Sequence, residues 1–207
     1  MARKRLSADT RRELIEASAS EVFAERGYRG GSIVEIARRA GVSAPVVYDH
    51  FPSKAELYRH LLERHFAALR QVWRDNLPGP EPAGERMGRA VDAWFAYAEE
   101  HPFAGRLLFR ESVADPEVRA IHEEVAGASR DEVMPLFADE PGAERLIGAP
   151  ADAGLEMVWV VLRGVLQGLA IWWADHPEVP REQVVATAMN SLWIGFERVS
   201  GGETYSL

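Results

Sequence analysis

The chain has 207 residues, of which 47% are hydrophobic and 27% charged, an ordinary globular balance that excludes wholesale disorder. It contains no cysteine, which excludes disulfides, thiol catalysis and cysteine-ligated metal centres. Its 24 Lys and Arg against 32 Asp and Glu give a net charge of −8, which at first sight argues against nucleic acid as a partner.

The N-terminal region predicts one long helix followed by a shorter one. Apolar residues recur at helical spacing from residue 9 to residue 26, and Gly27 is expected to end this helix in a left-handed conformation. Ser32 and Glu35 have the spacing of a capping box, which opens a second helix that ends before Gly41.

A third, short helix is expected next. Ser43 can cap it, and Pro45 is tolerated in its first turn, where the backbone N–H groups are unbonded in any case. Val47 and Phe51, four residues apart, face inward, and Pro52 ends the helix. Two short helices joined by a glycine-containing turn, after a first helix that packs on them, form a helix-turn-helix DNA-binding arrangement.

The rest of the chain also predicts helices, and no segment shows a convincing strand pattern. Ser53 and Glu56 open a long helix to about residue 76, and further helices are expected over residues 85–101, 103–113, 116–137, 151–175 and 181–199. We therefore expect an all-α fold of about nine helices. A three-helix helix-turn-helix domain would occupy residues 1–54, and a larger helical domain would occupy residues 55–207.

The acidic total conceals an uneven distribution of charge. Residues 1–54 carry ten Lys and Arg against seven Asp and Glu, whereas residues 55–207 carry fourteen against twenty-five. A head of net charge +3 thus precedes a body of net charge −11. Repulsion of the acidic body by phosphates would favour approach to DNA by the basic head.

Two segments resemble the DNA-binding signature of the TetR family of bacterial transcriptional regulators. They are Ser32–Leu57, with the sequence SIVEIARRAGVSAPVVYDHFPSKAEL, and Ile15–Tyr28, with the sequence IEASASEVFAERGY. The resemblance implies a bacterial homodimer that binds DNA, usually as a repressor, and is released from DNA by a small molecule, with residues 55–207 as the effector-binding and dimerisation domain. The lack of a secretory signal pattern and of a membrane-spanning stretch predicts a cytoplasmic protein.

The candidate DNA-binding residues lie in and around the third helix. Its first residues are small and suit contacts with thymine methyl groups, while nearby hydroxyl, imidazole and ammonium groups suit phosphate oxygens. Position by position, the resemblance implies phosphate contacts for Ser32, Tyr48, His50 and Lys54 and base contacts for the start of the third helix. The candidate set is Ser32, Ser43, Ala44, Pro45, Val46, Tyr48, Asp49, His50 and Lys54.

Two of these residues depart from the family pattern. Pro45 stands where Gly, Arg or Lys is common, and Asp49 stands where basic or aromatic residues are common. An aspartate in the groove is repelled by phosphate unless it accepts from cytosine N4 or pairs with an arginine. A solvated surface charge is the simpler interpretation of Asp49, and alternatives for Tyr48 and His50 are a core-capping aromatic and a surface residue.

The last two helices predict a dimer interface. Apolar residues step alternately by three and four along each of them, which is the pattern of helices packed at shallow angles. Burial inside a single chain is the alternative, but apolar residues on further faces favour a four-helix interface between two chains. The predicted interface residues are Val158, Leu162, Val165, Leu169, Trp172, Val185, Ala188, Leu192, Gly195 and Val199. Such a dimer would read a palindromic operator.

An unknown small-molecule effector is expected inside the C-terminal domain. Aromatic residues with nearby arginines would line its pocket, although an ordinary aromatic core explains the same residues equally well. The candidates are Trp94, Phe103, Arg106, Phe109, Arg110, Met157 and Trp159.

Catalysis, a cofactor, a metal site and a membrane partner are not expected. No catalytic motif is legible, and His60, Glu63 and His65 lack the i, i+4 histidine spacing of helical zinc sites. The most apolar stretch, residues 155–174, includes Glu156 and Arg163, and its charge-free part is too short to span a bilayer. Two alternatives remain: a constitutive DNA-binding regulator without an effector, and an all-helical small-molecule-binding protein or enzyme.

Overall fold

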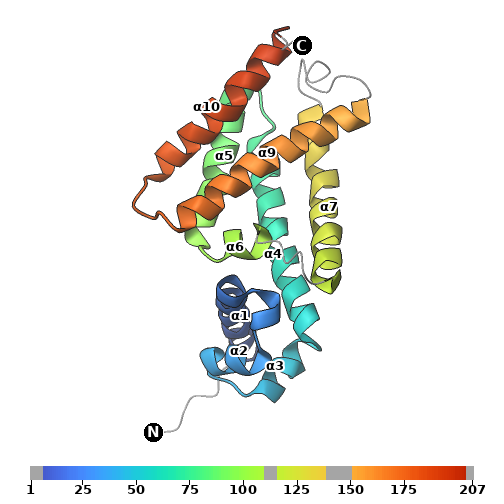
Figure 1. The fold of residues 1–207 in the computed structure, drawn as a ribbon, viewed down its shortest axis with the longest axis vertical. Helices are drawn as coiled ribbons and strands as arrows, with labels where there is room; N and C mark the ends of the chain where they lie inside the picture. The colour runs from blue at the N-terminus through green and yellow to red at the C-terminus, as the bar shows by residue number, and fades with distance from the viewer. Residues whose placement is uncertain (1–6, 110–115, 139–150, 204–207) are drawn as a thin grey trace. The chain divides into compact units, whose positions relative to one another are not determined.

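The computed structural model describes residues 7–109, 116–138 and 151–203, and within these ranges it contains nine α-helices and no strand (Figure 1). The predicted all-α fold is therefore confirmed. By their internal contacts the residues fall into two compact units. The N-terminal unit comprises Met1–Phe66 and Arg106–Val125, and the C-terminal unit comprises Ala67–Gly105 and Ala126–Leu207. The division at residue 54 remains a prediction about function.

Helix α2 begins and ends where the capping residues predict, whereas α1 continues past Gly27, its expected end. Helix α1 spans Ala8–Gly30, but Gly27 interrupts its geometry with a φ of 69°, a backbone conformation that favours glycine. Helix α2 spans Ile33–Ala40; the Ser32 hydroxyl accepts from the Glu35 N–H at its start, and Gly41 closes it in the left-handed region.

Helix α3, Ala44–His50, starts after Ser43, but the Ser43 hydroxyl makes no capping hydrogen bond. The expected cap is thus wrong in its side-chain part. A cap hydroxyl binds the N–H of the second or third helical residue; the second, Pro45, has none, and the N–H of the third, Val46, does not donate to Ser43 either. Residue Val47 is fully buried, and the helix ends before Phe51, which is also buried.

Helix α4, Lys54–Asn76, begins with the expected cap: the Ser53 hydroxyl accepts from the Glu56 N–H at 3.0 Å. Its first three turns belong to the N-terminal unit. There it joins a core drawn from α1, α2, α3 and α4. The fully buried side chains of that core are Ile15, Val22, Ile36, Val47, Leu57, Leu61 and Leu62.

A buried carboxylate fastens α4 to α1. Glu16 is only 6% exposed, yet it lies 3.0 Å from Arg12 Nε, 2.9 Å from His60 Nε2 and 2.5 Å from Arg64 Nη1. A buried charge is tolerated when several partners satisfy it, and here two of the three come from α4. The Arg12 guanidinium also lies over the Phe51 ring, 4.5 Å from its centroid.

Ion pairs join α1 to α2 on another side. Both terminal nitrogens of Arg39 donate to Glu25, at 2.9 and 2.6 Å, and one of them also donates to Glu35 at 3.1 Å. Arg26 lies 2.9 Å from the same Glu35 oxygen. The hydrogen bonds from Arg39 lower the pKa of Glu25, and those to Glu25 raise the pKa of Arg39.

Helix α7, Pro116–Ala138, contributes to both units. In the N-terminal unit its residues Val118 and Ile121 are buried, and Arg59 of α4 pairs with Glu124 at 2.7 Å. In the C-terminal unit, Arg74 of α4 lies 2.8 Å from Glu132. Helices α4 and α7 therefore lie side by side within each unit.

The C-terminal unit is built on α5, Ala83–Glu100, with α9, Ala151–Ala174, and α10, Arg181–Ser200. Arg181 ties α10 to α5, donating to Asp92 at 3.0 Å and Glu99 at 2.6 Å. A short helix, α6, spans Ala104–Phe109, so the expected helix over residues 103–113 extends outside the described residues.

The Glu16 cluster gives a stability prediction. Replacing Glu16 with Ala leaves three basic groups together without their carboxylate, so the free energy of unfolding should fall by about 1–3 kcal/mol. Urea denaturation followed by circular dichroism measures it, with Glu13→Ala, an exposed change on the same helix, as the control. Equal effects of the two substitutions would contradict the assigned role of Glu16.

Candidate nucleic-acid interface and effector region

The candidate DNA-binding residues gather on the outside of α3 and at the starts of α2 and α4. Val47 is the buried residue of α3, which leaves the other faces of this helix toward solvent. The exposed candidates are Ser32, Ser43, Pro45, Tyr48 and Asp49. The half-buried candidates are Ala44, Val46, His50 and Lys54.

The Tyr48 side chain is exposed enough to contact DNA. Its side chain is 51% exposed, and its hydroxyl bonds to no other residue that the structure describes. A core-capping role is therefore excluded. His50 is likewise without a hydrogen-bonding partner among the described residues, so its ring can meet a phosphate without breaking an internal contact.

Asp49 is exposed and has no ion-pair partner among the residues described in the structure. The carboxylate is therefore not neutralised by any arginine in the part of the chain that the structure describes. If α3 enters a major groove, Asp49 either accepts from a base donor or discourages close approach of phosphate.

Lys54, the first residue of α4, is held over an aromatic ring. Its ammonium lies 4.3 Å from the centroid of Tyr28, a cation–π distance. An ammonium has three donors, so contact with the ring face leaves N–H groups that can reach a phosphate.

The predicted effector residues differ widely in exposure. Trp94 is buried on α5, while Phe103, Arg106 and Trp159 are half-buried and Met157 is 63% exposed. The exposure of Met157 is contrary to a cavity-lining role in this conformation. The side chain of Phe109 and the whole of Arg110 lie outside the described residues.

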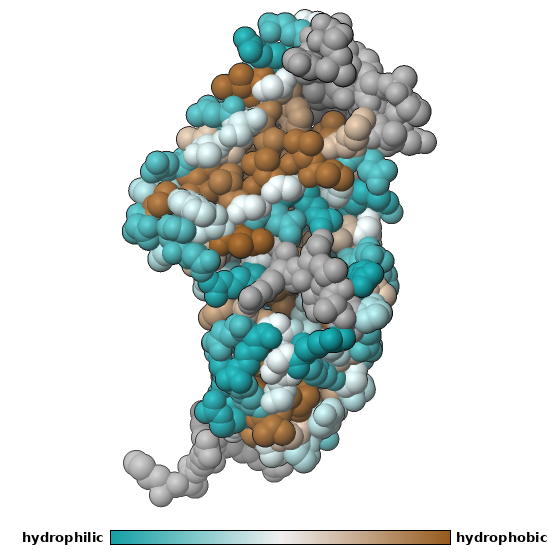
Figure 2. All heavy atoms as spheres, in the orientation of Figure 1, coloured by the Kyte–Doolittle hydropathy of each residue, from teal (hydrophilic) through white to brown (hydrophobic). Residues whose placement is uncertain are grey.

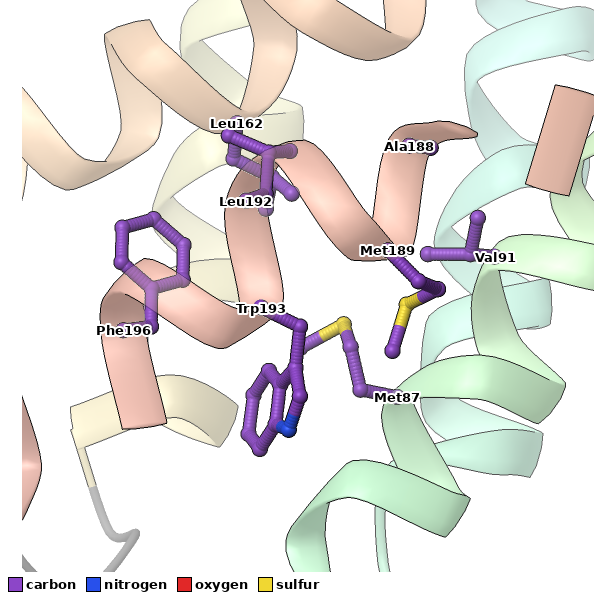
Figure 3. Close-up of a pocket in the computed structure, with 8 residues that line it drawn as sticks. All are labelled: Met87, Val91, Leu162, Ala188, Met189, Leu192, Trp193 and Phe196. Carbon is purple, nitrogen blue, oxygen red and sulfur yellow. The ribbon is translucent and has the colours of Figure 1, made fainter. Parts of the chain in front are cut away.

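A cavity in the C-terminal unit lies elsewhere, between α5, α9 and α10 (Figure 3). Its volume is about 10 Å³, which is room for roughly one water molecule, so a larger ligand requires its walls to move. All the lining side chains are apolar: Met87, Val91, Leu162, Ala188, Met189, Leu192, Trp193 and Phe196. None of these belongs to the predicted effector set.

Three predicted interface residues, Leu162, Ala188 and Leu192, form walls of this cavity and are buried within the chain. Trp172 is 46% exposed and Gly195 is also exposed, whereas the side chain of Val199 lies outside the described residues. The remaining residues of the set, Val158, Val165, Leu169 and Val185, are half-buried. The residues predicted for the dimer interface thus include part of the face that α9 and α10 each turn toward the interior of their own chain.

The outward face of α9 is apolar (Figure 2). Met157, Val161 and Trp172 are exposed on it, and Gly164 and Gly168 have open space around them. By length and composition alone, Glu156–Ala174 is the one segment of the described residues that could cross a membrane, and 22% of it is buried. An exposed apolar face of this kind is typical of a surface that binds a partner. The charges of Glu156 and Arg163 argue against a lipid bilayer as that partner.

The comparisons with known proteins agree on the kind of molecule. The family model described as "Bacterial regulatory proteins, tetR family" matches residues 15–61. The HTH-type transcriptional activator FasR of Mycolicibacterium smegmatis is 33% identical over 196 residues, covering 94% of this chain and 87% of FasR. The chain belongs to the TetR family of bacterial transcriptional regulators.

Solved structures of TetR-type regulators share the fold. A TetR-like regulator from Rhodococcus sp. RHA1 superposes with a TM-score of 0.74 at 20% identity, covering 93% of this chain and 99% of its own. FadR from Bacillus subtilis, solved in complex with stearoyl-CoA, gives a TM-score of 0.70 at 17% identity, covering 93% and 100%. As a TetR-family member, this chain is a DNA-binding transcriptional regulator and not an enzyme.

Sequence reasoning missed two residues of this TetR-family head. Val34 is 71% exposed, and Arg38, four residues later on the same face of α2, is exposed and pairs with no described residue. Their signal was present in the sequence, because both positions fall opposite the buried residues Ile33, Ile36, Ala37 and Ala40. An unpaired arginine beside the helix-turn-helix is a further candidate for phosphate contact.

The exposed positions on α3 predict separable effects on affinity and specificity. Replacing Tyr48 with Phe removes one hydroxyl, which should weaken binding to every operator sequence by about 2- to 12-fold. Replacing Pro45 with Arg should instead change the preferred sequence toward guanine, because arginine binds guanine in the major groove. Selection of bound sequences from random DNA measures both. A changed preference for Y48F, or an unchanged one for P45R, would contradict these roles.

Proposed function

We propose that this protein is a homodimeric regulator in the bacterial cytoplasm that binds a palindromic operator and is released from it by a small-molecule effector. The observation that carries the DNA-binding part is the free outer surface of α3, where Tyr48 is half-exposed beside Ser43 and His50. Two such helices related by a two-fold axis meet half-sites about 34–36 Å apart, or a multiple of that spacing.

The exposed face of α9 supports the homodimer. Two copies of this face can pack closely, because Gly164 and Gly168 lie one turn apart with no atom near the position of an added Cβ. Met157, Val161 and Trp172 would then be buried on either side of the glycines. Ile194, exposed on α10, adds apolar surface to the same unit.

The sign of regulation depends on the position of the operator. A dimer bound across a promoter obstructs RNA polymerase, so repression is the function we propose for an overlapping operator. Activation is the second candidate, because the relative FasR is named a transcriptional activator. A reporter gene placed under the selected operator, with and without the regulator, distinguishes the two.

Long-chain acyl-CoA is the effector class we propose. Its support is the wholly apolar lining of the cavity between α5, α9 and α10, together with the stearoyl-CoA bound by the structural neighbour FadR. The cavity must widen to admit an acyl chain, and Met87 and Met189 in its wall are unbranched side chains that repack readily.

The dimer proposal is tested by a charge on the α9 face. Val161→Glu places a carboxylate in the proposed interface and should turn a dimer into a monomer, with loss of palindrome binding. Multi-angle light scattering and footprinting measure the two effects. Ala120→Glu, an exposed change on α7, is the control and should leave the dimer intact. A dimer that survives Val161→Glu would exclude this face as the interface.

The effector proposal is tested by titrating the operator complex with stearoyl-CoA. The DNA affinity should change by about 10- to 100-fold, which requires a coupling of about 1.4–2.8 kcal/mol. Coenzyme A and stearate, added separately, show which part of the molecule acts. An affinity that stays constant at saturating stearoyl-CoA would exclude this class and favour a constitutive regulator or a different effector.

A further inference from the structure

We propose that Tyr28 is a positioning residue for the DNA-contacting Lys54, and that the first half of α7 holds Tyr28 in place. The inference rests on the proposed phosphate contact of Lys54. It identifies α7, which contributes to both units, as an element through which effector binding can change the DNA-binding surface.

The first step is the contact between Tyr28 and Lys54. Tyr28 follows the interruption of α1 at Gly27, and its ring faces the Lys54 ammonium at 4.3 Å. Lysine has a flexible four-carbon stem, so an unsupported Lys54 would sample many positions at the start of α4. The ring attracts the ammonium to one of them without consuming its hydrogen-bond donors.

The second step is the packing of Tyr28 itself. Its ring stacks on Phe23 with centroids 6.0 Å apart and meets Tyr58 edge-on at 5.1 Å. Tyr58 also meets Phe23 edge-on, at 5.2 Å, so the three rings contact one another. A change in the position of Tyr58 is therefore transmitted to the ring on which Lys54 lies.

The third step is the connection to α7. The Tyr58 hydroxyl lies 2.7 Å from His122 Nε2, and Tyr58 is only 3% exposed. The Tyr28 hydroxyl donates to Glu117 at 3.4 Å, five residues before His122 on the same helix. Helix α7 thus contacts both tyrosines from its first half.

Helix α7 also reaches the C-terminal unit, where Arg70 of α4 donates to Ser129 at 2.9 Å. Between these two sets of contacts α7 carries Ala126, Gly127 and Ala128, and no atom lies near the position of a Cβ on Gly127. Small residues permit bending of a helix at this point. A displacement of residues 116–125 would loosen the tyrosines and with them Lys54.

The test is the salt dependence of operator binding, measured by fluorescence anisotropy with the full chain. Lys54→Ala should make the slope of log affinity against log salt shallower by about one for each DNA-bound chain. Tyr28→Leu should do the same, while Tyr28→Phe, which keeps the ring face, should retain the wild-type slope. The double variant of Tyr28→Leu and Lys54→Ala should have the slope of Lys54→Ala alone.

The α7 part is tested with His122→Ala, which should also make the slope shallower, against the exposed control Glu123→Gln, which should not. The His122→Ala variant serves if Tyr28→Leu does not fold. An unchanged slope for Lys54→Ala would overturn the phosphate contact and the inference together. A shallower slope for Lys54→Ala with an unchanged one for folded Tyr28→Leu, or for His122→Ala, would overturn the inference alone.

Discussion

An isolated helix of seven residues is not stable in water, so α3 must be stabilised by the rest of the protein. The DNA-binding surface depends on that stabilisation. Helix α3 is stabilised by tertiary packing, because Val47 and the adjoining Phe51 are buried in the core shared by α1, α2 and α4. Because only a small part of the α3 surface is buried in that core, Tyr48 and its neighbours remain exposed to solvent. The stability of the head and the availability of its contact surface therefore have the same origin.

Charge is arranged around this core in two ways. Many basic groups of the head form ion pairs within the chain: Arg39 and Arg26 pair with exposed or half-buried carboxylates, and Arg12 pairs with the buried Glu16. Arg38 and Lys54 differ, since Arg38 has no described partner and Lys54 lies over the ring of Tyr28 and not against a carboxylate that the structure shows. Net charge locates the basic head, but pairing decides which cations can reach DNA.

Much of the fold could be predicted because its signals are local. Gly41 and the cap at Ser32 fix helix ends through backbone geometry, and the spacing of Val47 and Phe51 identifies the inner face of α3. The packing of the C-terminal unit was harder to predict from the sequence. Leu162 and Leu192 have the spacing predicted for a dimer interface, yet they line a cavity inside the chain. Periodicity identifies an apolar helix face, but it does not tell whether that face packs within the chain or against a second chain. The Tyr28–Lys54 contact joins residues 26 positions apart and has no sequence signal.

The most direct test of the account is a crystal structure of the protein bound to its selected operator. The account predicts that α3 lies in the major groove, with the Tyr48 hydroxyl and the Lys54 ammonium each within hydrogen-bond distance of a phosphate. It also predicts that Lys54 keeps its place over Tyr28. A complex in which α3 stays outside the groove, or in which Tyr48 and Lys54 both point away from the DNA, would contradict it.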